Sequence, residues 1–220
     1  NLSGDIAHFF GPILEELVTE DADCMVIYSG GDDFFIVGRW DRLPYIANRI
    51  HEEFRNYCGF NPDVTVSMAI NVAPDVKFPL YKVAKKTGDD LDSKAKSLKR
   101  ANGLEKDAVC VFGIPIGWEE FPNAENIKSL LTDALNQGVS RSLLNIIYST
   151  KSLDEEAKEN DSLFKSWRAI YALTRLKERH GKQRDVISQI SDSILLEGNK
   201  LYPHTMLCAR WAEFETRNSG

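Results

Sequence analysis

Residues 24–38, CMVIYSGGDDFFIVG, place two apolar runs on either side of two glycines and two aspartates. Short apolar runs joined by paired glycines are typical of a tight β-hairpin. The turn is Gly30-Gly31-Asp32-Asp33, and its glycines would let the backbone approach a ligand closely. Adjacent carboxylates are hard oxygen ligands that suit Mg²⁺. The stretch therefore predicts two strands with a metal–nucleotide site at their turn. The alternative is an ordinary Gly-Gly-Asp turn with a solvated second aspartate.

Further elements around the hairpin predict an α+β domain. Helical spacing of apolar residues predicts a helix over residues 5–18, which Gly11-Pro12 should kink, and Asp41 should cap a second helix reaching about Cys58. The remaining expected elements are a strand at 64–72, a helix at 79–101 with an interruption near 88–90, and a final strand at 108–112. This order is close to a ferredoxin-like or polymerase-palm layout. We expect the first strand of such a palm to lie before residue 1.

The second half of the chain differs in character from the first. Strand signals stop after Trp118, and helices are expected at about 123–137, 140–150, 162–181, 183–197 and 203–216. Residues 1–138 hold 14 basic and 22 acidic residues, whereas residues 139–220 hold 13 basic and 11 acidic residues. We therefore predict two domains, a palm over residues 1–116 and an all-α helical bundle over residues 117–220.

Composition narrows the class of protein. The chain has 220 residues and 43% apolar content, enough to bury a core, and no apolar run approaches the roughly 20 residues that span a bilayer. It shows no signal peptide and begins without methionine, so we expect a piece of a longer protein. Its four cysteines are scattered, which favours buried free thiols in a reducing cytoplasm over disulfides or zinc. No histidine stands out as catalytic.

The sequence of the hairpin resembles that of a known protein family. The stretch YSGGDDFFIVGRW, residues 28–40, is similar to the palm hairpin of the large, polymerase-like subunit of type III CRISPR effector complexes, with the III-A (Csm) branch closest. Other segments follow the order of that family along nearly the whole chain. They are Phe9-Phe10, Asn61-Pro62, Val64–Ile70, Ala95-Lys96 up to Asn102, Phe112-Gly113, Trp118, Val139–Leu144, and Trp167-Arg168 with Tyr171.

The resemblance implies a function. The family's large subunit makes cyclic oligoadenylate from ATP when its complex binds target RNA, and this chain would be the second palm with the terminal helical domain. Asp32 and Asp33 match the catalytic pair that binds Mg²⁺ or Mn²⁺, while Ser29, Gly30 and Gly31 match the turn that faces the nucleotide. Since the second ATP would bind another palm outside this chain, we expect little or no activity from the chain alone. The implied partners are other protein subunits, guide RNA and target RNA in the cytoplasm, with no membrane.

Basic residues supply further candidates. Lys96 could meet a triphosphate, with a solvated helix face as the alternative, and it is grouped with Lys94, Lys99 and Arg100. Related diguanylate cyclases place basic residues in a comparable Ala-Lys helix. A basic stripe at three-, four- or seven-residue steps could contact RNA phosphate or an acidic partner, or be an ordinary exposed face; its members are Lys165, Arg168, Arg175, Arg179 and Lys182. Trp118, Trp167 and Trp211 are expected in core or interface packing rather than base stacking.

Two other readings of the function stay open. In the first, the chain is mainly an assembly module whose helical bundle docks protein neighbours and RNA. In the second, weaker one, it is a diguanylate cyclase. Those enzymes usually carry Glu after Gly-Gly-Asp, whereas Asp33 stands here and a helical bundle follows.

Overall fold

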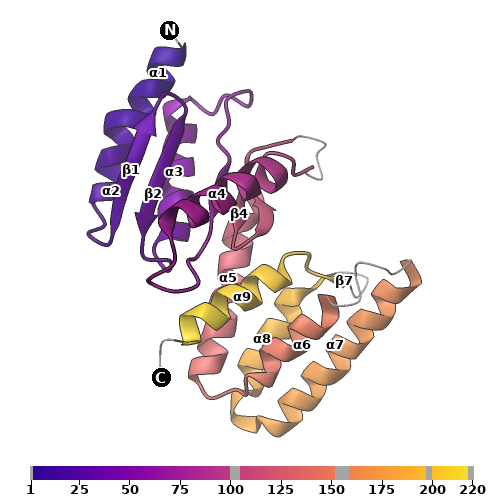
Figure 1. Cartoon of the computed structure of the whole chain (residues 1–220). Helices are drawn as coiled ribbons and strands as arrows, with labels where there is room; N and C mark the ends of the chain where they lie inside the picture. The colour runs from indigo at the N-terminus through magenta and orange to yellow at the C-terminus, as the bar shows by residue number, and fades with distance from the viewer. Residues whose placement is uncertain (1, 100–104, 152–158, 197–199, 218–220) are drawn as a thin grey trace. The chain divides into compact units, whose positions relative to one another are not determined.

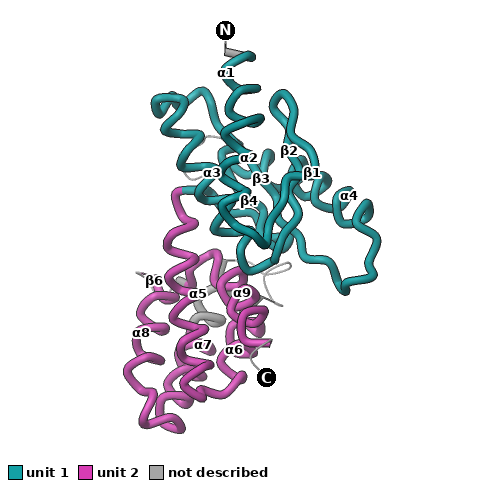
Figure 2. Tube along the Cα trace, turned by 90° about the vertical axis from the view of Figure 1, so that its left-hand side faces the viewer, with its two compact units in different colours: residues 1–118 teal, residues 119–220 magenta. Residues whose placement is uncertain are grey.

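The computed structural model describes residues 2–99, 105–151, 159–196 and 200–217. The chain forms two compact units, Asn1–Trp118 and Glu119–Gly220, which Figure 2 colours separately. Unit 1 is α+β and unit 2 is mainly helical, as the sequence predicted, but the described part of unit 2 also holds a two-stranded pair that was not predicted. No helix in the described ranges is both long and apolar enough to cross a membrane.

Unit 1 begins with a helix that is broken where proline and glycine meet. Helix α1 (Leu2–His8) runs into the π-helical turn η1 (Phe9–Ile13) and then α2 (Leu14–Thr19). Gly11 has non-helical dihedral angles, φ −98° and ψ −105°, and Pro12 lacks a backbone donor. The predicted kink is therefore confirmed. Phe9 and Phe10 in this turn are both buried.

The predicted hairpin is present. Strand β1 (Cys24–Gly30) pairs antiparallel with β2 (Asp33–Gly38), in a register that sets Cys24 opposite Gly38 and Gly30 opposite Asp33. The register shifts between Val26 and Tyr28, as in a β-bulge, which locally increases strand twist. In Figures 1 and 2, α1 lies at the end of the hairpin that carries the turn.

Helix α3 (Leu43–Tyr57) follows the hairpin and buries Ile46, Ile50 and Phe54. The expected cap by Asp41 is wrong, because Arg42 occupies the N-cap position and makes no side-chain capping bond. Asp41 instead accepts a hydrogen bond from Arg39, whose Nη2 lies 2.7 Å from Oδ2. The charge of the nearby guanidinium therefore holds the carboxylate away from the helix terminus.

A second sheet completes unit 1. Strand β3 (Met68–Ile70) pairs parallel with β4 (Ala108–Val111), which pairs antiparallel with β5 (Ile114–Gly117). The expected strand at 64–72 is thus shorter, and the carbonyl of Val66 accepts a hydrogen bond from the Trp118 indole at 2.9 Å rather than a ladder bond. Strand β5 was not predicted, because proline and glycine in the IPIG run masked it.

Between β3 and β4, helix α4 (Leu80–Asp90) continues into a second π-helical turn, η2 (Leu91–Ala95). The interruption expected near residues 88–90 is therefore displaced to residues 91–95. The helix ends at Ala95, earlier than the predicted end at residue 101, because residues 96–99 form a turn and then a β-bridge between Lys99 and Glu105. Residues 100–104, which include Asn102, lie outside the described residues.

Unit 2 is a bundle of helices that starts after the 3₁₀ turn η3 (Trp118–Glu120). Its helices are α5 (Phe121–Asn136), α6 (Ser142–Lys151), α7 (Glu159–Arg179), α8 (Arg184–Ile194) and α9 (Thr205–Arg217), with the 3₁₀ turn η4 (Gly181–Gln183) before α8. Helix α5 packs on α8 and α9, and α7 packs on α6 and α8. The five predicted helices are confirmed, but α8 ends at Ile194 because a short pair, β6 (Leu195–Leu196) with β7 (Lys200–Leu201), follows it.

One charged cluster lies inside this bundle. The Lys128 ammonium is 2.9 Å from Glu215 Oε1, and Thr132 donates to Glu215 Oε2 at 3.0 Å. Only 5% of the Lys128 side chain is exposed, so the charge depends on these partners. The cluster ties α5 to α9 at one register.

All four cysteines are free thiols, as the sequence predicted. Cys24, Cys110 and Cys208 are buried, and Cys58 is half-buried. Burial raises the pKa of Cys110 to about 11 and that of Cys208 to about 12. These thiols therefore stay protonated and unreactive in the folded chain.

The hairpin leaves no room for a side chain opposite Cys24. A Cβ at Gly38 would overlap Cys24 Sγ and lie 3.0 Å from the Asp23 carbonyl oxygen. We expect Gly38→Ala to lower the free energy of unfolding by roughly 1–3 kcal/mol, because the backbone must shift. Urea unfolding followed by circular dichroism measures the change.

Gly88→Ala is the matched control, since nothing lies within 4 Å of a Cβ there and the residue is inside α4. We expect it to stabilise the chain by about 0.5–1 kcal/mol. Equal urea midpoints for wild type and Gly38→Ala would contradict the packing argument.

Candidate functional site

The turn between β1 and β2 has the geometry that its glycines require. Gly31 and Asp32 are the two turn residues between the paired Gly30 and Asp33. Gly31 has φ +66°, while Asp32 is not among the residues with positive φ. Positive φ at the first turn position alone is the type II′ pattern, which favours glycine there. The backbone at Gly31 is exposed, so a ligand can reach it.

Two carboxylates project from this turn into solvent. Asp32 and Asp33 are both exposed, and within the described part of the chain no hydrogen bond or ion pair engages either side chain. Mg²⁺ is commonly held by one or two carboxylates, with water and substrate phosphates completing its octahedron. Since the described residues contain no cluster of three acidic, histidine or cysteine ligands, this donor set fits a shared metal rather than a closed protein cage.

Aromatic packing fixes the strand that carries these carboxylates. Phe34, the residue after Asp33, stacks on Phe10 with ring centroids 5.3 Å apart and an interplanar angle of 21°. Phe10 also stacks on Phe54 of α3 at 5.1 Å. The turn is thus attached to two helices through rings, while its polar groups stay available to a ligand.

The other predicted nucleotide-binding residues lie in two places. Ser29 is half-buried in β1 opposite Phe34, and Gly30 is half-buried at the end of the strand. Lys96 lies just after η2, and its ammonium is 2.8 Å from Asp92 Oδ1 in an exposed ion pair. The structure therefore brings Ser29, Gly30, Gly31 and the two aspartates together in one turn. No contact joins Lys96 to them among the described residues, and its role stays a prediction.

Lys94, which the sequence grouped with Lys96, has a structural position instead. Its ammonium lies 2.6 Å from Asp90 Oδ1 and donates to the Gly113 carbonyl at 3.0 Å. Asn71 donates to Asp90 Oδ2 at 2.8 Å. This network joins α4 and η2 to the loop after β3 and to the turn between β4 and β5.

Asp90 is charged although it is buried. Burial alone would raise the pKa of this carboxyl, but hydrogen bonds from Lys94 and Asn71 outweigh burial and hold the pKa below its usual value. The sequence did not single out this residue, because an aspartate two positions after Gly88, at an expected helix interruption, is usually solvated.

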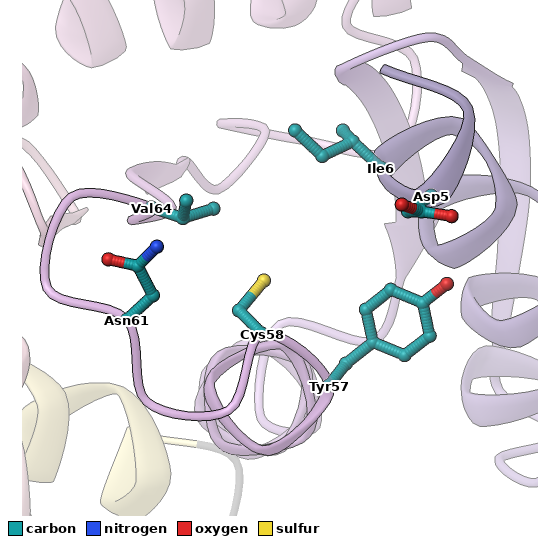
Figure 3. A pocket seen from close by; sticks show the side chains of 6 residues that line it. All are labelled: Asp5, Ile6, Tyr57, Cys58, Asn61 and Val64. Atoms are coloured by element: carbon teal, nitrogen blue, oxygen red, sulfur yellow. The ribbon is translucent and has the colours of Figure 1, made fainter. Parts of the chain in front are cut away.

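A cavity of about 320 Å³ lies between α1 and the end of α3 (Figure 3). Its lining combines a carboxylate, a phenol, a thiol, an amide and two aliphatic side chains, which come from Asp5, Ile6, Tyr57, Cys58, Asn61 and Val64. The volume is at the lower end of the range for small-molecule sites. No sequence pattern predicts this cavity, because its residues come from segments about fifty positions apart.

In unit 2 the basic stripe is exposed. Arg168, Arg175, Arg179 and Lys182 all face solvent, while the side chain of Lys165 lies outside the described residues. Trp118 and Trp211 are buried as expected. Trp167 is 63% exposed, so it does not pack in the core, and packing at an interface stays a prediction for it.

Comparisons with known proteins agree with this architecture. Residues 1–109 match a family described as Cas10/Cmr2, second palm domain. Three similar relatives carry the name "CRISPR system single-strand-specific deoxyribonuclease Cas10/Csm1 (subtype III-A)". The Mycobacterium tuberculosis relative is 31% identical over 172 residues, 77% of this chain and 20% of the relative.

The Methanocaldococcus jannaschii relative is 27% identical over 142 residues, 62% of this chain and 18% of the relative. The Streptococcus thermophilus relative is 27% identical over 201 residues, 85% of this chain and 24% of the relative. The chain thus spans about a fifth of the length of these relatives, and similarity extends beyond unit 1 into the helical unit.

The buried Asp90 network predicts a pH dependence of stability. Because the folded-state pKa of Asp90 is depressed, its contribution is fully present above the unfolded pKa near 4 and is lost as pH falls through the lower folded pKa. We expect Asp90→Asn to lower the free energy of unfolding by roughly 1–3 kcal/mol at pH 7, and to reduce its fall on acidification.

Asp92→Asn is the control, because its pair with Lys96 is exposed and should change stability by no more than about 0.5 kcal/mol. Urea unfolding between pH 3 and pH 7 makes the comparison. Parallel stability curves for wild type and Asp90→Asn across this range would show that the network does not govern acid stability.

Proposed function

Because the chain belongs to the Cas10 family of type III CRISPR effectors, through its second palm domain, we propose that it contributes one half of a site that makes cyclic oligoadenylate from ATP. Target RNA would trigger the reaction, and a second palm would supply the other half. One observation carries the proposal: two exposed carboxylates, unpaired among the described residues, stand on a glycine turn anchored by stacked rings.

In the proposed reaction the 3′-hydroxyl of one ATP attacks the α-phosphate of another, and pyrophosphate leaves as the new P–O bond forms. Asp32 and Asp33 hold a divalent cation, Mg²⁺ or Mn²⁺. When bound, this cation neutralises charge on the triphosphate and lowers the pKa of the attacking hydroxyl. Gly30 and Gly31 let the backbone approach the nucleotide, and Ser29 offers a hydroxyl beside them.

Lys96 is the proposed counter-charge for the phosphates. Its pair with Asp92 is exposed, and exposed pairs contribute only about 0–1 kcal/mol. A triphosphate can therefore exchange for Asp92 at little cost. Lys94 is unsuited to this role, because moving it would leave the buried Asp90 without its ammonium partner.

The surroundings of the chain are proposed from the same family. We place it in the cytoplasm, in a complex with other protein subunits, guide RNA and target RNA. The names of the relatives specify a deoxyribonuclease acting on single strands, and that activity belongs to proteins about five times longer than the aligned segments.

An assembly role is the second candidate, and the exposed aromatic and basic side chains of α7 favour it. An assembly role is compatible with synthesis of cyclic oligoadenylate by the same parent protein. The diguanylate cyclase alternative predicts GTP rather than ATP as substrate, which a panel of labelled nucleotides separates.

The metal pair is tested by Asp32→Asn together with Asp33→Asn in the assembled effector complex. We expect production of cyclic oligoadenylate from ATP to fall at least about a thousandfold, because the cation loses both carboxylates. Thin-layer chromatography of labelled ATP products, with target RNA and Mn²⁺ present, measures the loss.

Glu52→Gln with Glu53→Gln is the matched control, since it neutralises two adjacent exposed carboxylates on α3. It should leave both assembly and synthesis unchanged. Unaltered synthesis in the double asparagine variant would exclude the turn as the metal site.

The isolated chain provides a separate test. We expect little or no ATP turnover from it with Mn²⁺, because the second ATP would be bound by another palm. Robust cyclic product from the chain alone, lost in the Asp32 and Asp33 variant, would overturn the half-site proposal while keeping the metal assignment.

A further inference from the structure

Helix α7 carries two kinds of side chain in parallel lines on its exposed face. Trp167 and Tyr171, one turn apart, are 63% and 62% exposed. At 100° per residue they lie within about 40° of each other around the helix axis. The opposite face is buried in the bundle through Ala169, Leu173 and Leu176.

The second line is basic. Arg168, Arg175 and Arg179 are exposed and fall within about 40° of one another, beside the aromatic line. Lys182, in the turn η4 that follows, is also exposed. Residues 167–182 hold five basic residues and one acidic residue, whereas the whole chain has a net charge of −6. This concentration of positive charge suits a polyanion.

Arg175 connects the two lines. Its Nε donates to the Tyr171 hydroxyl at 3.1 Å, and its guanidinium carbon lies 5.5 Å from the centre of the Tyr171 ring. Glu178 holds the same guanidinium at 2.9 Å. Tyr171 is therefore ordered before any partner binds, which reduces the entropy lost on binding.

We propose that this face, the α7 stacking face, binds single-stranded nucleic acid directly. Its members are Trp167, Arg168, Tyr171, Arg175, Arg179 and Lys182. Bases stack on the two rings, and phosphates lie along the basic line. A single strand has bases on one side and charge on the other, which matches aromatic and basic lines that run side by side.

An acidic protein surface is the competing partner, and it explains less. Such a surface satisfies the arginines but gives no reason for two exposed rings one turn apart. Every base has a π-face, so both rings and cations are used when the ligand is a nucleic acid. The inference does not depend on the turn at residues 30–33, which lies in the other unit.

The test is a fluorescence-anisotropy titration of the full chain with fluorescein-labelled single-stranded RNA at several salt concentrations. We expect Trp167→Ala with Tyr171→Ala to weaken binding about ten- to a hundredfold at every salt concentration. Trp167→Phe with Tyr171→Phe keeps two stacking rings and should restore affinity to within about threefold. Circular dichroism verifies that each variant is folded.

The basic residues of this face should determine how RNA affinity depends on salt. Arg168→Gln, Arg179→Gln and Lys182→Gln together should reduce the slope of log affinity against log salt by about 2, because single strands give roughly 0.7 per phosphate contact. Two controls in unit 1 match these changes. Tyr81→Ala removes a 69% exposed ring, and Lys82→Gln, Lys85→Gln and Lys86→Gln together remove three exposed charges.

Three results would overturn the proposal. The first is a wild-type chain that does not bind the RNA. The second is a loss of RNA affinity in the control variants that equals the loss in the α7 variants. The third is binding of a fluorescein-labelled polyglutamate peptide without binding of RNA, which would assign the face to an acidic protein partner.

Discussion

The stacking of Phe34 between the hairpin and the first helices is the contact on which unit 1 depends. Phe34 packs on Phe10, and Phe10 packs on Phe54, so a chain of rings runs from β2 through the kinked helix to α3. Phe9 adds an edge contact to Phe54 at 5.0 Å. Because Asp33 precedes Phe34 directly, the position of the carboxylates follows from this apolar packing. Polar groups at the turn are then left for a ligand.

The hairpin was predictable from the sequence, but the aromatic packing that holds it in place was not. Apolar runs around Gly30-Gly31 are a local signal, and the turn formed with Gly31 at the position that needs positive φ. The rings that hold it come from positions 10, 34 and 54, and no local pattern links them. The same holds for the cavity between α1 and the end of α3, whose residues meet only in the fold.

Prediction failed where a polar group found a partner other than the expected one. Asp41 was expected to cap α3, but the Arg39 guanidinium takes its carboxylate. The strand expected from residue 64 starts at Met68, and the Trp118 indole takes the carbonyl of Val66. The apolar neighbours of Trp167 predicted packing in the core or at an interface, and the bundle buries Leu173 and Leu176 but leaves this ring exposed. Lys94 and Lys96 look alike in sequence. Only the fold shows that Lys94 belongs to the Asp90 network and that the Lys96 ammonium is exposed.

The buried thiols make local opening of each unit measurable by chemical modification. Cys24 and Cys110 lie in unit 1 and Cys208 lies in unit 2, all protected by packing rather than by disulfides. An alkylating reagent can reach them only after the surrounding core opens, so the rate of modification at each position measures local opening. Mass spectrometry of the separate cysteine peptides would thus report the opening free energies of palm and bundle in one sample, without any introduced label.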